Sequence, residues 1–170
     1  MLNIKQSFRT GLGFGLTSGI ITTLGLMVGL NAGTHSKTAV VAGILVIAIA
    51  DALSDALGIH VAEETNKNRS KKEIWEASGA TFVSKFVTAL TFVVPILFLN
   101  LAMAVIVGAV WGLFLIAIFS VYLAKQPFGR ELRAERQKKP SFQIILEHIS
   151  IAILVIVITY FIGRWVGGLG

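Results

Sequence analysis

Long uncharged stretches separated by short charged segments dominate the chain. No Asp, Glu, Lys or Arg lies between Arg9 and Lys37, and residues 86–124 form a run of 39 residues without one. About 20 helical residues are enough to cross a bilayer core of roughly 30 Å. As a single helix at about 1.5 Å per residue, the longer run would extend over roughly 58 Å. It therefore has to fold back as two spans.

This pattern predicts an all-α integral membrane protein with a single transmembrane domain of five helices, because helices satisfy their own backbone groups in lipid. The expected spans cover residues 11–31, 39–62, 79–99, 102–124 and 144–164. We expect a kink near Pro95 and a turn at Asn100. The connection 125–143 is expected to be helical, since Glu131 and Glu135 lie beside basic residues.

Basic residues gather on one side of the predicted bundle. Twelve of them precede the first span or lie in the two longer connections: Lys5, Arg9, Lys67, Arg69, Lys71, Lys72, Lys125, Arg130, Arg133, Arg136, Lys138 and Lys139. The other side has Lys37 and Arg164. This asymmetry predicts a cytoplasmic N-terminus and an exterior C-terminus. The net charge of +6 therefore indicates orientation in a lipid bilayer, and no nucleic-acid partner is expected.

Glycines recur every fourth residue along the first span. Gly11, Gly15 and Gly19 form one row, and Gly25, Gly29 and Gly33 form a second. Such rows let two helix backbones approach closely in a membrane. The first row is a candidate dimer interface, and close packing within one protomer is the alternative.

Asp51 and Asp55 lie four residues apart in the second span, so both project from the same side of a helix. A carboxylate at this depth is costly unless it is paired, hydrated or protonated, and such residues typically serve transport or proton relay. Two carboxylates with nearby hydroxyls suit a hard or borderline divalent cation, and they could equally take up protons. The structural alternative is an ion pair with Lys85 of the third span.

A second group of polar residues lies where two spans are expected to leave the membrane on the cytoplasmic side. His60, Glu63 and Glu64 lie at the cytoplasmic end of the second span, and Glu147 and His148 lie at the start of the fifth. Carboxylate and imidazole together suit Fe²⁺, Mn²⁺ or Zn²⁺. If the two helix ends are neighbours, they form a metal entrance, although the basic residues at 67–72 would repel a cation. Ordinary interfacial polarity is the alternative.

Three segments resemble the vacuolar iron transporter family. They are Gly15–Leu30 (GLTSGIITTLGLMVGL), Ala52–Gly58 (ALSDALG) and Ile158–Gly163 (ITYFIG), which resemble parts of the family's first, second and fifth helices. The resemblance implies a homodimer of five-helix protomers with a path for Fe²⁺ or Mn²⁺ between them. Along this path, Ser18 and Thr22 would join Asp51 and Asp55. Export of the cation would be coupled to inward proton movement.

The chain departs from this family at three places. The family's first-helix acid falls on Ser18, its second-helix methionine falls on Asp55, and a short basic stretch at 65–72 replaces its acidic metal-collecting domain. A carboxylate in place of a thioether favours harder ions such as Mn²⁺ or Mg²⁺. The departures could mean a relocated site charge, a different substrate or a relative that does not transport.

Two functions remain open. The first is a cation and proton transporter, expected in the plasma membrane of a prokaryote, with no resident cofactor. The second is a membrane scaffold or regulatory subunit with a structural pair between an aspartate and Lys85. A transporter should have both carboxylates facing a solvated cavity, whereas a scaffold should have them sealed against Lys85. An enzyme is not expected, because the chain has no HExxH or GxSxG motif.

Overall fold

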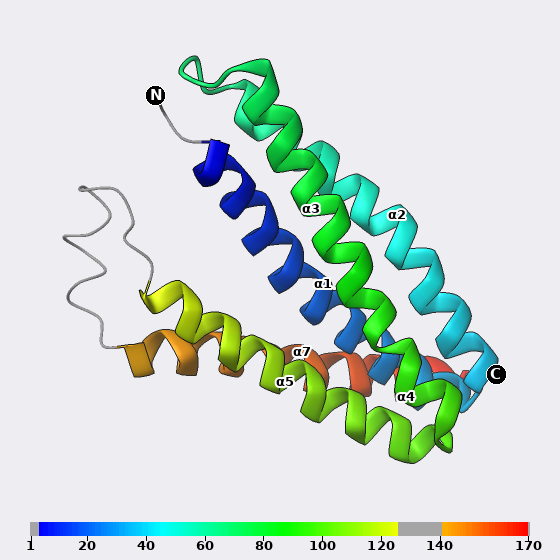
Figure 1. The fold of residues 1–170 in the computed structure, drawn as a ribbon. Coiled ribbons are helices and arrows are strands. Elements are labelled where there is room, and N and C mark those ends of the chain that lie inside the picture. The colour runs from blue at the N-terminus through cyan, green and yellow to red at the C-terminus, as the bar shows by residue number, and fades with distance from the viewer. Residues whose placement is uncertain (1–3, 126–140, 170) are drawn as a thin grey trace.

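The computed structural model describes residues 4–125 and 141–169, and all of its regular secondary structure is helical (Figure 1). The helices are α1 (Ile4–Thr34), α2 (Lys37–Glu64), α3 (Lys71–Thr91), α4 (Val93–Phe98), α5 (Leu101–Lys125) and α7 (Ser141–Gly167). The helix expected around Glu131 and Glu135 lies outside the described residues. So do five of the twelve basic residues, namely Arg130, Arg133, Arg136, Lys138 and Lys139.

Within the described part of the chain, five helical segments are long and apolar enough to cross a membrane. The all-α class and the five expected spans are thus confirmed, while the orientation relative to the cytoplasm stays a prediction. The helices extend past the expected boundaries. For example, α1 begins at Ile4 and α3 at Lys71. The added residues are polar end turns, which an uncharged stretch does not include.

The third span is interrupted at Phe92, where α3 ends and α4 begins. Proline has no backbone N–H, so Pro95 cannot donate to the carbonyl of Thr91, four residues earlier, and the helix breaks there. The predicted turn at Asn100 is confirmed. Its side-chain Oδ1 accepts a hydrogen bond from the backbone N–H of Met103 at 3.0 Å and thereby caps the start of α5.

Helices α1, α2 and α3 run side by side, and α5 and α7 form a second pair set at an angle to them (Figure 1). Helix α1 contacts α2, α3, α5 and α7, and so links the two groups. The N-terminus lies at the same end as the connection 65–70 (Figure 1). We call this the N-terminal end of the bundle. The C-terminus lies at the opposite end, near the turn between α1 and α2.

The first glycine row of α1 packs against α3 of the same chain. A Cβ atom at Gly11 would overlap the carbonyl oxygen of Ala77, and one at Gly15 would overlap Thr81 and Ser84. At Gly19 a Cβ would lie 3.2 Å from the Cα of Lys85. The dimer interface expected at Gly11, Gly15 and Gly19 is therefore wrong for this face, because α3 already covers it. The alternative, close packing within the protomer, is what the structure has.

The second glycine row packs against α7 in the same way. Gly29 lies against Thr159, and a Cβ at Gly163 would overlap the carbonyl oxygen of Gly29. Gly33 approaches Gly163 and Gly167. Helix α1 is thus held closely on two sides, by α3 along its first half and by α7 along its second half. The apolar core lies between these contacts and includes Ile20, Leu24, Met27, Val40, Ile44, Phe92, Ile96, Ala104, Ile116 and Ala152.

Candidate cation site between helices α1, α2 and α3

Lys85 is the central residue of the site. Its side chain lies on α3 and is only 2% exposed. The Nζ atom lies 2.5 Å from Oδ2 of Asp51, donates a hydrogen bond to Oδ2 of Asp55, and donates another to Oγ of Ser18 at 2.9 Å. Every ionic partner of a buried ammonium reduces the cost of removing its charge from water. Two carboxylates and a hydroxyl therefore stabilise one positive charge inside the bundle.

The spacing along each helix explains why these residues meet. Asp51 and Asp55 are one turn apart on α2, so both reach the same side chain. Ser18 of α1 donates a hydrogen bond to Oδ2 of Asp55 at 2.6 Å. Gly19 follows Ser18 and lets the backbone of α3 come close at Lys85. The first glycine row thus brings the ammonium within reach of α1 and α2.

The carboxylates are less buried than the ammonium that they hold. The side chain of Asp51 is 32% exposed and that of Asp55 is 20% exposed. The cluster therefore reaches the surface of the isolated protomer on the side of α2. Both carboxylates contact Lys85, as expected for a scaffold. Neither carboxylate is sealed from its surroundings, however, and this agrees with the expectation for a transporter.

The nearby hydroxyl groups mostly bind helix backbone. Thr22 donates to the carbonyl oxygen of Ser18 at 2.9 Å, so its hydroxyl is not aimed at the carboxylates. Thr81 donates to the carbonyl oxygens of Ala77 and Gly11, and Ser84 to that of Thr81. Of the four residues expected along a translocation path, Ser18, Asp51 and Asp55 come together. Thr22 lies one turn away from Ser18 on α1.

The expected entrance residues do not come together. His60 contacts Ser78 at 3.2 Å and the ring of Trp75, while His148 lies 2.7 Å from Ser120 of α5. Figure 1 shows the first turns of α7, which carry Glu147 and His148, well apart from the end of α2, which carries Glu63 and Glu64. A shared vestibule of these five residues is therefore wrong. Within the described ranges, no three His, Cys, Asp or Glu side chains are arranged to hold a metal ion.

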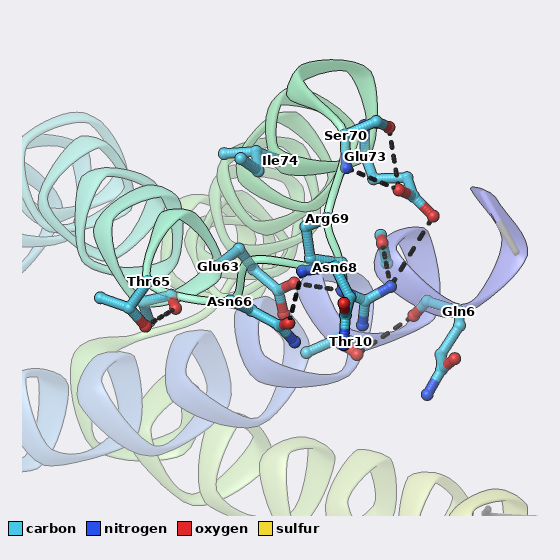
Figure 2. Close-up of polar contacts among 12 residues, drawn as sticks. Gln6, Thr10, Glu63, Thr65, Asn66, Asn68, Arg69, Ser70, Glu73 and Ile74 are labelled. Atoms are coloured by element: carbon cyan, nitrogen blue, oxygen red, sulfur yellow. Dashed lines mark hydrogen bonds and ion pairs between the residues drawn. The ribbon is translucent and has the colours of Figure 1, made fainter. Parts of the chain in front are cut away.

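Arg69 points inward, although the sequence grouped it with basic residues that would repel cations. Its Nε lies 2.8 Å from Oε2 of Glu63, its Nη1 donates to Oγ of Ser7 at 2.8 Å, and the same Nη1 lies 3.9 Å from Oε1 of Glu73. Figure 2 shows Arg69 between the two glutamates. The acidic residues before and after Arg69 in the sequence, Glu63 and Glu73, are the signal that could have revealed this pairing. The neighbouring Lys67, Lys71 and Lys72 are exposed, as expected.

Comparison of the sequence with known proteins identifies no family for the chain. The chain matches no protein-family model, and no curated protein matches it. The resemblance to vacuolar iron transporters thus depends on the three segments and on the predicted number and arrangement of the helices.

Proposed function

We propose that the chain is a multi-pass transporter that moves a divalent cation out of the cytoplasm, across the plasma membrane of a prokaryote, in exchange for protons. One observation carries this proposal. Asp51, Asp55 and Ser18 gather oxygen atoms around a positive charge inside a bundle of apolar helices. Ionisable residues inside a membrane typically mark ion pathways or proton relays, and this favours transport over packing alone.

The chemistry of the donors indicates the class of ion. Carboxylate and hydroxyl oxygens suit hard and borderline divalent cations, of which Mn²⁺ and Fe²⁺ are the expected cargo. The family resemblance supports the same two ions and a counter-flow of protons. Within the described residues the site has no thiolate or imidazole ligand, and this favours Mn²⁺ over softer ions.

Lys85 competes with a metal ion for the carboxylates. Its ammonium lies between the same oxygen atoms that a metal ion would use, so an arriving cation has to displace it. This competition weakens cation binding, and a transport site has to be weak enough to release its ion. The ammonium then restores the charge balance of the two carboxylates once the ion has left.

Closure of the cluster by Lys85 favours a second candidate, a scaffold or regulatory subunit in which the ion pair only stabilises the fold. In that case the carboxylates would bind no transported ion. The partial exposure of Asp51 and Asp55 in the protomer supports transport, because a cation moving along α2 could reach both carboxylates.

Exchange of Asp55 for asparagine tests the proposal. Asp55→Asn keeps the size of the side chain and its contact with Lys85, but removes the charge that a cation needs. We expect cation uptake by proteoliposomes to be abolished, and Asp51→Asn to reduce it at least in part. Uptake is measured separately for Fe²⁺, Mn²⁺, Zn²⁺ and Co²⁺.

A matched control is Asn68→Asp, the reverse exchange in the exposed connection between α2 and α3. It should transport like the parent protein. Unchanged uptake of all four ions by both aspartate variants would exclude the assignment of the site. Absence of uptake by the parent protein, together with a stable fold, would favour the scaffold.

We further propose that the transporter is a homodimer, with the second copy against the outer face of α2. Ala50, Ser54, Gly58 and Ala62 form an exposed row of small residues there, beside the partly exposed carboxylates. A second helix packed on this row would cover Asp51 and Asp55, which would be costly to leave facing lipid. The interface thus moves from α1, where the sequence placed it, to α2.

Gly58→Leu tests this interface. Within the described residues, a Cβ atom at Gly58 meets nothing closer than 4 Å, so a leucine there should leave the protomer intact. It should nevertheless keep a second copy away and convert dimers into monomers. Chemical cross-linking in membranes and the mass measured in mild detergent would show the change. A variant that dimerises like the parent, or a parent that is monomeric, would contradict the proposed interface.

A further inference from the structure

One guanidinium group joins three helices at the N-terminal end of the bundle. Arg69 lies in the connection after α2, and it contacts Ser7 of α1, Glu63 of α2 and Glu73 of α3. Its side chain is only 11% exposed. The planar fork of arginine suits such simultaneous contacts better than lysine would. These contacts tie together the ends of the same three helices that form the cation site.

The contacts differ in strength. Glu73 is already held by Ser70, whose backbone N–H and hydroxyl donate to Oε2 at 2.9 and 2.8 Å, and its distance of 3.9 Å to Arg69 is the longest of the three. The shorter contacts join Arg69 to α1 and α2. In addition, Oε2 of Glu63 is buried without a well-aligned hydrogen bond. The contacts of Arg69 are therefore formed, but the hydrogen-bonding capacity of Glu63 is not fully used.

The three helices are not equally free to separate at this end. The first glycine row holds α1 against α3 in backbone contact. Helix α2 has no such row against its neighbours. At this end Arg69 pairs with Glu63 of α2 and donates a hydrogen bond to Ser7 of α1, and His60 of α2 contacts Ser78 of α3. Glu63 lies eight residues beyond Asp55, about 12 Å along the helix. Movement of α2 at this end would thus open a short path to the carboxylates.

We propose that Arg69 is a latch that holds the cytoplasmic end of α2 closed against α1 and α3, and that its release admits water and ions to Asp51 and Asp55. The role of the latch in admitting ions rests on the proposed transport function. The proposal that Arg69 holds the end of α2 closed does not depend on transport. A latch of this kind is one half of alternating access, in which a central site opens to one side at a time. The structure is the state in which the N-terminal end is closed.

Thiol labelling tests the latch without any transport measurement. The chain has no cysteine, so Ser78→Cys introduces a single thiol. Ser78 is buried on α3 opposite His60, between the latch and Lys85. The full-length variant is placed in inside-out and right-side-out vesicles, and a membrane-impermeant maleimide is added. Addition of Arg69→Gln should raise the labelling rate about tenfold from the side of the connection 65–70, because the closed state loses its main ionic contact.

Lys67→Gln is the matched control, since it removes the same charge two residues away from an exposed side chain. It should label at the rate of the parent. If Arg69→Gln does not fold, Glu63→Gln replaces it, because this variant removes the charge that pairs Arg69 with α2 and leaves the cap of α3 by Glu73 intact. Equal labelling of the latch variant and the Lys67→Gln control would overturn the proposal.

A cross-link separates failure of the latch from failure of the proposed function. In a variant that carries both Glu63→Cys and Arg69→Cys, the two thiols are joined with a short, reducible bifunctional reagent. Uptake of Mn²⁺ should stop in the cross-linked protein and return on reduction, whereas Asp55→Asn should remain inactive in both states. Uptake that continues in the cross-linked protein would overturn the latch while leaving the cation site in place. A parent that takes up no cation would refute the transport function, and labelling of Ser78→Cys would still decide whether Arg69 closes this end.

Discussion

Replacement of Gly15 by leucine should destabilise the protomer by about 3 kcal/mol, the upper part of the range for an overpacked core. A Cβ atom at this position would overlap the hydroxyl of Ser84 and the carbonyl oxygen of Thr81. The carbonyl belongs to the backbone of α3, so it can move only if the two helices separate. The midpoint of thermal unfolding in detergent should therefore fall by many degrees.

Gly79→Leu provides the matched control on α3. Within the described residues nothing lies within 4 Å of a Cβ atom at Gly79. Leucine in place of glycine inside a helix should be neutral or should stabilise by up to about 1 kcal/mol. If both variants unfold at the same temperature, the close packing of α1 on α3 does not stabilise the protomer. If Gly15→Leu yields folded monomers from a dimer, the row is an interface between copies after all.

The second large effect concerns Lys85. Lys85→Met should lower the free energy of unfolding by about 3–5 kcal/mol, because it leaves two carboxylates without their cation. A triple variant that also carries Asp51→Asn and Asp55→Asn should recover most of this loss, since no unpaired charge remains. Chemical denaturation of the three proteins in the same detergent measures both changes.

The triple variant also separates the two candidate functions. A triple variant that is as stable as the parent but has lost the cation uptake that the parent shows would mean that the charges serve transport. Recovery of stability, when neither the parent nor the triple variant takes up cations, would mean that the ion pair is structural. If Lys85→Met is as stable as the parent, the ammonium does not neutralise the carboxylates, and the contacts of Lys85 with Asp51 and Asp55 do not stabilise the fold.

The parts of the fold that depend on local sequence could be predicted. Runs without charge give the spans, and Asp51 and Asp55 share a side of α2 because they are four residues apart. The break at Phe92 could also be predicted as a kink near Pro95, since proline removes the hydrogen bond to the residue four positions before it. These features need no knowledge of neighbouring helices.

Features that depend on neighbours could not be read in the same way. A glycine row has the same sequence whether it faces α3 or a second protomer, so Gly15 could not be assigned to either. Arg69 contributes one positive charge to the asymmetry whether it points to lipid headgroups or to Glu63. Lys85 was named only as an alternative partner, because its depth relative to Asp51 depends on how α3 is shifted along α2.

The ion cluster has a consequence for how the protein enters the membrane during synthesis. Insertion of a lone lysine near the centre of a span costs about 2.5–3.5 kcal/mol, and each aspartate of α2 has a comparable cost. Only residues 65–70 separate α2 from α3, so the two helices can leave the translocon as a pair. We expect Asp51, Asp55 and Lys85 to neutralise one another at that stage, which makes the pair, rather than either helix alone, the unit that the translocon passes to the lipid.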